Sequence, residues 1–272
     1  MGQCCIPAGL KISPEVYSGR DSLPEDIIQV TDESDQALID DLIGVISRSF
    51  CGTKACAPEP AISWGLDPKA SGDNPTQPLL SEPQENRIKY FDFFAGYMVH
   101  SALRHGGCFV LKGPEGKVVA GTVTFPPNSK NLHRTGLCES MSIVSRMGGW
   151  SKVKTPELEK GDPPKREKKL QEAMNKAHKA HANGRHIYVF AFGVDVGEQG
   201  KGYGRKLLTF LTESAAALHV PVYLECSGER TERFYGNNGF EVPQRYPLIY
   251  KDQRFCPDKL EGMAAMVWNG NN

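Results

Sequence analysis

The segment with the clearest chemical potential is a glycine-rich stretch between an apolar run and an amphipathic one. It spans residues 194–205 and reads VDVGEQGKGYGR. Glycines let a backbone approach a ligand closely, and successive N–H groups at a helix N-terminus form a cradle for an anion such as a diphosphate. Lys201 and Arg205 add positive charge to the same stretch. The segment therefore predicts a site for a phosphate-bearing cofactor.

Two common phosphate-binding motifs fit this stretch poorly. A dinucleotide-binding fingerprint has the spacing G-x-G-x-x-G and an acidic residue about 20 positions later. Here Gly200, Gly202 and Gly204 follow the spacing G-x-G-x-G. A P-loop needs Gly-Lys followed by Ser or Thr, which this stretch lacks. A nucleotide-dependent oxidoreductase is therefore disfavoured.

The elements that must position this loop follow from the spacing of apolar residues. Strands are predicted over 27–30, 108–112, 117–125, 187–194 and 220–226, and helices over 34–50, 85–104, 165–182, 206–219 and 229–237. A Gly-Pro-Glu-Gly sequence between the second and third strands indicates a hairpin. This order of strands and helices is typical of α/β or α+β construction.

Three stretches fall outside the regular pattern. Residues 1–23 are expected to form a disordered tail, residues 51–86 a long loop rich in Pro and Gly, and residues 128–185 an insertion. The insertion is too weakly apolar to fold as a domain of its own. We therefore expect one domain over residues 24–270.

Composition excludes several classes of protein. Lys and Arg number 32 and Asp and Glu number 32, so the net charge of +0 disfavours a nucleic-acid binder. No apolar run reaches the roughly 18 residues that a transmembrane helix needs. The cysteines are scattered rather than framing a short disulfide-rich chain, and the first residues lack the features of a secretory signal. A cytoplasmic protein with reduced thiols is expected.

The N-terminal residues offer positions for lipid anchoring. Gly2 suits a myristoyl chain, and Cys4 and Cys5 suit palmitoyl groups. Ile6 stands where a myristoylation signal has Ser or Thr, so an unmodified tail is favoured over an anchored one.

Two segments in the last third of the chain resemble motifs of the GNAT superfamily of acyl-CoA N-acyltransferases. QGKGYG at residues 199–204 matches the diphosphate-binding pattern Q/R-x-x-G-x-G/A. VPVYLECSGERTERFYGNNGFE at residues 220–241 resembles the family's fifth strand and next helix, with their Phe-Tyr and Gly-Phe signature. The close resemblance covers about residues 186–241. It implies an α+β fold, in which a mixed, mostly antiparallel sheet is flanked by helices and a large insertion precedes the fourth strand.

The resemblance also implies a reaction, namely direct transfer of an acetyl group from acetyl-CoA to an amine in a ternary complex without a metal. The expected cofactor-binding residues are Phe192, Gly193, Val194, Gln199, Gly200, Lys201, Gly202, Tyr203, Gly204 and Arg205. A backbone N–H near Val194 would hold the oxyanion of the tetrahedral intermediate. Tyr235 matches the position of the family's general acid, which returns a proton to the coenzyme A thiolate.

The general base is predicted from the alternation of a strand. Alternation places Tyr223, Glu225 and Ser227 on one face. A carboxylate flanked by apolar residues is costly unless it is paired, so Glu225 is either a structural hydrogen-bond acceptor or a base with a raised pKa. Glu225 is the predicted base, and Asp195 at the end of the preceding strand is a second candidate.

The chain departs from the family pattern in two places. Gly228 stands where many members have Asn, so the resemblance does not supply the polar contact that this position often makes to the cofactor or to an active-site water. The insertion at 128–185 is larger than a minimal family member needs, and in this the chain resembles the branch of puromycin-type small-molecule acetyltransferases. The 51–86 loop and this insertion are predicted to line the acceptor side. A small amine is the predicted acceptor; the alternatives are a protein lysine or N-terminus, or a catalytically silent acetyl-CoA-binding module.

Three histidines cluster near the end of the insertion. His178, His181 and His186 have weak spacing for a metal site, and no cysteine pair supports one. They are predicted to lie on a solvated helix face.

Overall fold

The computed structural model describes residues 23–31, 34–53, 58–66, 84–105, 107–127, 137–149 and 163–270. The predicted tail up to residue 22, much of the predicted 51–86 loop and residues 128–136 and 150–162 lie outside these ranges. The elements are β1 (Ile27–Val30), α2 (Gln36–Cys51), α3 (Pro60–Leu66), α5 (Gln84–Ala102), η1 (Leu103–His105), β2 (Cys108–Lys112), β3 (Val118–Phe125), α6 (Leu137–Arg146), α7 (Pro163–His181), β4 (Ile187–Val194), η3 (Val196–Glu198), α8 (Tyr203–Ala217), β5 (Val222–Cys226), α9 (Glu229–Gly236), β6 (Glu241–Tyr246), β7 (Ile249–Tyr250), β8 (Gln253–Arg254), η4 (Pro257–Lys259) and β9 (Met263–Trp268).

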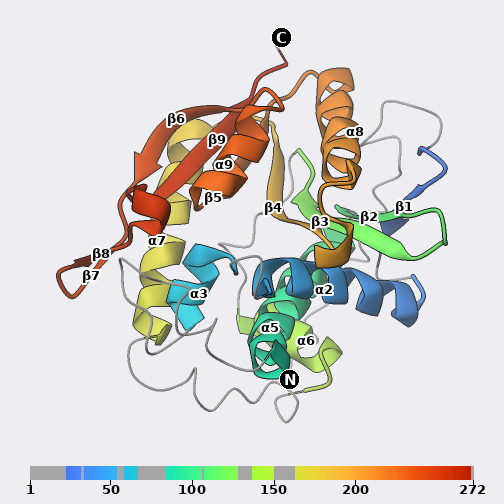
Figure 1. The fold of residues 1–272 in the computed structure, drawn as a ribbon, viewed down its shortest axis with the longest axis horizontal. Coiled ribbons are helices and arrows are strands. Elements are labelled where there is room, and N and C mark those ends of the chain that lie inside the picture. Colours follow the sequence, from blue (N-terminus) through green and yellow to red (C-terminus); the bar gives the residue numbers. More distant parts are fainter. Residues whose placement is uncertain are drawn as a thin grey trace.

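A seven-stranded sheet with the strand order β1-β2-β3-β4-β5-β9-β6 forms the centre of the fold (Figure 1). β4 and β5 run parallel, whereas each of the other neighbouring pairs is antiparallel. The predicted α+β fold with a mixed, mostly antiparallel sheet is therefore confirmed.

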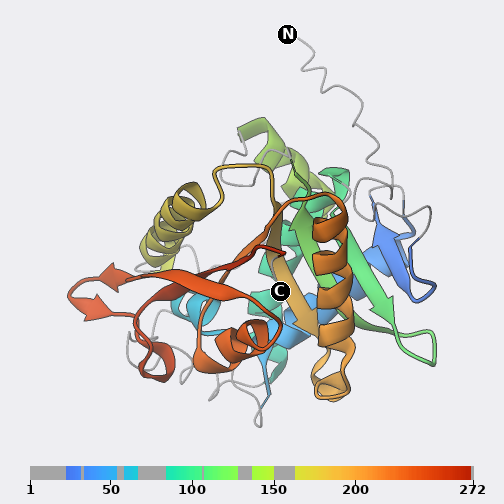
Figure 2. The same ribbon diagram turned by 90° about the horizontal axis from the view of Figure 1, so that it is seen from above.

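Helices cover both faces of the sheet. The apolar faces of α2, α5 and α7 pack on one side, where Ile46, Val99 and Ala177 belong to one buried cluster. Helices α8 and α9 pack on the other side, where Leu211 and Tyr235 belong to a second cluster. Both views place β4 between α7 and α8 (Figures 1 and 2). Side chains that alternate along the strands thus bury apolar groups on both faces.

The sheet splits at its parallel pair. β4 and β5 are paired only between Ile187–Val189 and Val222–Leu224. On the opposite edge of β4, Val123 pairs with Ala191 but Thr124 pairs with Val189, which leaves Phe190 as an extra residue. Such a bulge bends the strand that carries it. Beyond the paired residues the two strands part, and this split positions the site described below.

The prediction of a loop throughout residues 51–86 is wrong for Pro60–Leu66, which form α3. Proline is favoured at the first helical position, because its fixed backbone angle suits a helix and its missing N–H is not needed there. Trp64 of this helix is wholly buried, and Ala61 nearly so. Burial against the rest of the protein stabilises a helix that the many prolines around it conceal in the sequence.

The insertion at residues 128–185 contributes to the core. The predicted helix near its end is confirmed as α7, and Leu170 and Ala177 of that helix are buried. A further helix, α6, was not predicted. Within the described residues, no helix combines the length and the apolar character that crossing a membrane requires.

Candidate active site

A cleft of about 550 Å³ opens where β4 and β5 part. Its walls come from the end of α2, the start of α3, the end of β4 with the loop into α8, the start of α9, and η4. Nine of the ten residues predicted to bind the cofactor line this cleft, and the tenth, Lys201, does not. Tyr235 lines it as well, whereas Glu225 does not. The fold therefore brings most of the predicted residues together.

The glycine-rich loop has the geometry of an anion cradle. Gly200 and Gly202 have φ angles of 83° and 88°, in the left-handed region that favours glycine. Gly202 caps the N-terminus of α8 without a side-chain hydrogen bond. The first turn of a helix leaves backbone N–H groups without helical partners, and its dipole favours negative charge there. This end of the cleft is therefore suited to a phosphate group.

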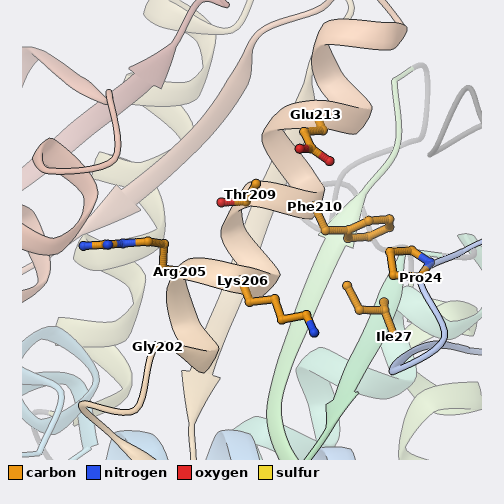
Figure 3. Close-up of a pocket in the computed structure, with 8 residues that line it drawn as sticks. All are labelled: Pro24, Ile27, Gly202, Arg205, Lys206, Thr209, Phe210 and Glu213. Carbon is orange, nitrogen blue, oxygen red and sulfur yellow. The ribbon is translucent and has the colours of Figure 1, made fainter.

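The cations near the loop point in different directions. Arg205 lines the cleft, whereas Lys201 is exposed and its Nζ lies 2.9 Å from the Glu198 carboxylate. Lys206 forms an ion pair with Asp26 on the far side of α8. Figure 3 shows Arg205 and Lys206 extending to opposite sides of the helix. A second hollow, of about 360 Å³, has both residues in its lining. The first turn of α8 thus presents Arg205 to the cleft.

The end of β4 presents its backbone to the cleft. Gly193 pairs with Gly121 of β3 on one side, and its other side faces the split because β5 has diverged. A Cβ atom at Gly193 would lie 2.1 Å from the Ser49 Oγ, so glycine allows the end of α2 to approach the strand. A strand edge of this kind can hydrogen-bond to an extended ligand as another strand would.

Tyr235 lies in an aromatic wall of the cleft. Its ring centroid is 5.2 Å from that of Phe234, 5.5 Å from that of Phe240 and 6.3 Å from that of Phe192. Burial, with a smaller contribution from Cys226, raises the pKa of the Tyr235 hydroxyl above its ordinary value. The hydroxyl therefore keeps its proton at neutral pH and is available as a donor.

Glu225 projects from β5 on the face predicted from the alternation. Its two carboxylate oxygens accept hydrogen bonds of 2.8 Å from the hydroxyls of Tyr188 and Tyr223. Burial raises the pKa of Glu225 to about 7, although the two hydroxyls oppose that rise. The carboxyl group is thus held by two tyrosines outside the cleft lining, and its role as a base stays a prediction.

A second carboxylate, Glu59, was missed by the sequence analysis and lines the cleft itself. One carboxylate oxygen accepts a 2.6 Å hydrogen bond from the Ile62 N–H, and the other accepts one from the Ser227 hydroxyl. The Ser227 oxygen also accepts a 3.2 Å hydrogen bond from the Ala61 N–H. Burial raises the pKa of Glu59, opposed by these hydrogen bonds. Glu59 is therefore a half-buried carboxylate in the same cleft as Tyr235.

A sequence signal for Glu59 does exist. It lies between Pro58 and Pro60, and the Ser63 N–H donates to its carbonyl oxygen over 3.1 Å, which starts α3. The Glu59 N–H in turn donates to the Phe50 carbonyl oxygen over 2.7 Å. A proline at the first helical position marks a helix start, so the Glu-Pro pair could have indicated an acidic residue at a helix N-terminus.

Asp195, the second candidate base, is held away from the cleft by ion pairs. Arg48 of α2 donates from Nε and Nη2 to one of its oxygens, over 3.1 and 2.8 Å. The Lys117 Nζ lies 3.9 Å from the same oxygen. Asp195 is not among the residues that line the cleft. It ties α2 to the end of β4.

The prediction that the three histidines lie on a solvated face is wrong for His178, which is buried. The Nε2 atoms of His178 and His186 are 2.8 Å apart, and the His178 ring lies against those of Tyr188 and Tyr223. His181 is close to Gln244, with 3.2 Å between Nε2 and Oε1. These contacts hold the end of α7 on the sheet.

Comparisons with known proteins agree with this geometry. Residues 169–240 match the Acetyltransferase (GNAT) family. No curated protein matches the chain in sequence.

Three solved structures illustrate the fold. Arylalkylamine N-acetyltransferase 2 from Aedes aegypti is 16% identical, with a TM-score of 0.52 over 90% of this chain and 100% of that chain. The histone acetyltransferase HPA2 and related acetyltransferase from Corynebacterium glutamicum is 16% identical, with a TM-score of 0.50 over 89% and 93%. An agmatine N-acetyltransferase is 20% identical, with a TM-score of 0.50 over 89% and 99%. At these identities the likeness concerns the fold. Together with the family match over residues 169–240, it shows that the chain has a GNAT-like fold.

Proposed function

We propose that the protein transfers the acetyl group of acetyl-CoA to the amine of a small molecule, directly and within a ternary complex. The observation that carries this proposal is that one cleft is lined both by an anion-binding segment and by groups that can transfer protons. The segment is the glycine-rich loop with Arg205, and the groups are Glu59 and Tyr235. Anion binding and proton transfer are thereby joined along one path.

The cofactor lies along β4 in this proposal. Its diphosphate accepts hydrogen bonds from the N–H groups of residues 200–205, and Arg205 adds a charged partner. The extended pantetheine arm follows the backbone of residues 192–194, where β4 has no β5 partner. This path carries the thioester toward the deep end of the cleft, where Tyr235 and Ser227 lie.

The chemistry starts from an amine that is protonated at neutral pH and cannot attack. Glu59 takes a proton from the ammonium, directly or through water, and its raised pKa makes it a better base than an ordinary carboxylate. The amine nitrogen then attacks the thioester carbonyl carbon, and a backbone N–H near Val194 stabilises the oxyanion. The C–S bond breaks, Tyr235 donates its proton to the departing thiolate, and the amide forms as the nitrogen loses its second proton, directly or through water, to the Tyr235 phenolate.

Glu225 remains the alternative base. It lies on the same face of β5 as Ser227, which contacts Glu59, and its pKa of about 7 suits a base at neutral pH. Both oxygens of Glu225 are already engaged by tyrosine hydroxyls, whereas Glu59 borders the cleft. We therefore assign the base to Glu59 and a supporting role to Glu225.

A small acceptor is favoured by the surroundings of Glu59. The carboxylate is flanked by Pro58 and Pro60 and backed by Ser227, which is 3% exposed, so the amine must enter a confined space. A slender amine meets this requirement more easily than a residue on a folded protein surface. The size of the insertion supports a branch similar to the puromycin-type small-molecule acetyltransferases.

Release of coenzyme A thiol, measured across a panel of monoamines, diamines and peptides, tests the proposal. Thiol release with small amines and formation of the matching N-acetyl product are expected. Release only with peptides would identify a protein acetyltransferase. Acetyl-CoA binding without thiol release under any condition would identify a silent binding module and refute the proposed function.

A further inference from the structure

One contact bridges the two sides of the split sheet across the cleft. Gln199 follows β4, whereas Arg230 lies in the first turn of α9, which follows β5. The Arg230 Nη2 donates a 2.5 Å hydrogen bond to the Gln199 Oε1. The Gln199 Nε2 in turn donates to the Val194 carbonyl oxygen over 3.1 Å. Because both side chains line the cleft, this contact links its opposite walls.

The charges at this end of the cleft favour an anion between those walls. Arg205 on α8 and Arg230 on α9 both line the cleft. The nearby carboxylate of Glu198 is already paired with Lys201 over 2.9 Å. Two arginines, one on the helix that follows β4 and one on the helix that follows β5, thus border the loop that is suited to a diphosphate. A diphosphate in this setting carries two negative charges.

The start of α9 leaves little room for a side chain at Gly228. Gly228 has a φ angle of 82°, and a Cβ atom on it would lie 3.1 Å from the Asp258 Oδ2 and 3.4 Å from the Pro60 Cγ. A polar side chain at this position is therefore disfavoured by both backbone strain and space. The next residue of α9 whose side chain lines the cleft is Arg230, two residues on.

We propose that Arg230 exchanges Gln199 for the diphosphate of acetyl-CoA and so clamps the cofactor from the wall opposite Arg205. This role rests on the proposed function. A guanidinium group matches phosphate oxygens with two parallel N–H donors, and hydrogen bonds between charged groups are about twice as strong as neutral ones. The exchange replaces a neutral amide acceptor by a charged one, so acetyl-CoA binds more tightly. A diphosphate held by both Arg205 and Arg230 also draws the start of α8 and the start of α9 together.

Calorimetric titration of the full chain with acetyl-CoA, and with S-acetylpantetheine as a cofactor that lacks the diphosphate, tests this role. Arg230→Gln is expected to weaken acetyl-CoA binding about 10- to 100-fold. Binding of S-acetylpantetheine is expected to stay unchanged. The affinity for acetyl-CoA should fall less steeply with rising salt concentration in the variant than in the wild type, because one charged contact is absent.

The matched control is Arg233→Gln. Arg233 lies on the same helix, carries the same charge and is exposed like Arg230, but it forms an ion pair with Glu229 and is not among the residues that line the cleft. It should bind acetyl-CoA like the wild type. Arg230→Lys, which keeps the charge but not the planar fork, should fall between the wild type and Arg230→Gln.

Two results overturn the clamp. The first is wild-type acetyl-CoA affinity and salt dependence in Arg230→Gln. The second is an equal loss of affinity for acetyl-CoA and S-acetylpantetheine, which would mean that Arg230 acts on the pantetheine part of the cofactor and not on its diphosphate. If the wild type itself binds no acetyl-CoA, the proposed function fails, and that outcome differs from both of these.

Discussion

The raised pKa of Glu225 predicts how protein stability depends on pH. In the folded chain its pKa is about 7, against an ordinary value of 4.5, so the folded state holds the proton more tightly than the unfolded state. The protonation of Glu225 therefore makes its full contribution to the free energy of unfolding below about pH 4.5, and this contribution is lost as the pH rises through about 7. A tenfold difference in proton affinity between the two states corresponds to about 1.4 kcal/mol, so the free energy of unfolding should fall by up to about 3 kcal/mol across this window.

The variant Glu225→Gln removes this titration. Its amide cannot accept both tyrosine hydroxyl protons, which lowers the free energy of unfolding by a similar amount at every pH. Its stability relative to the wild type should therefore improve by about 1.4 kcal/mol for each pH unit between about 5 and 7. Urea unfolding at pH 5, 6, 7 and 8, followed by circular dichroism, measures the difference directly.

A second variant tests the cause of the raised pKa. The Tyr188 hydroxyl stabilises the charged form of Glu225, so Tyr188→Phe should raise the pKa of Glu225 further. The upper end of the pH range in which stability falls should move upward, whereas the lower end, which the unfolded chain determines, should stay near pH 4.5. If the free energy of unfolding depends on pH in the same way in the wild type and in Glu225→Gln, the argument is refuted. That result would mean that Glu225 has the same pKa in the folded and unfolded states.

Three substitutions in the cleft have separate expected outcomes. Glu59→Gln should lower kcat by roughly 10² to 10⁴ and remove the acidic limb of the pH–rate profile, with acetyl-CoA affinity unchanged; a retained limb would transfer the base to Glu225. Tyr235→Phe should lower kcat by a similar factor with little change in the KM for acetyl-CoA, and full activity would return this side chain to a packing role. Gly204→Val should weaken acetyl-CoA binding, because a Cβ atom there lies 3.2 Å from Val194 and 3.4 Å from Phe234; unchanged calorimetric affinity in a folded variant would contradict the cradle.

Local patterns predicted most of the elements around the cofactor loop. β4 is an eight-residue apolar run, and α8 has apolar residues at helical spacing, so each signal is complete within its own segment. β9 was missed although it lies between β5 and β6 in the sheet. Its sequence MAAMVW contains two alanines, which are depleted in strands, and shows no alternation of apolar and polar residues. Pairing with strands on both sides, rather than local preference, determines its structure.

The candidate site was harder to predict because its contacts join distant segments. Alternation gave the face of Glu225, but its partner Tyr188 comes from a different strand, and the register of β4 on β5 brings the two together. His178 lies on a helix rich in Lys and Glu, which favoured an exposed position. Its burial depends on His186 and two tyrosine rings that the helix pattern does not contain.

The position of Glu59 depends on the insertion, although none of the described residues of the insertion line the cleft. Glu59 immediately precedes α3, and Trp64 anchors that helix in a small apolar cluster with Leu170 of α7. The Trp64 ring centroid lies 5.5 Å from that of Phe255, and the Arg166 Cζ of α7 lies 5.7 Å from the Trp64 ring centroid. A buried tryptophan contributes on the order of 3–5 kcal/mol, enough to hold a helix of 7 residues in place. The described part of the insertion therefore supports the carboxylate in the cleft, and its loss would displace Glu59 as well as change the surroundings of the acceptor.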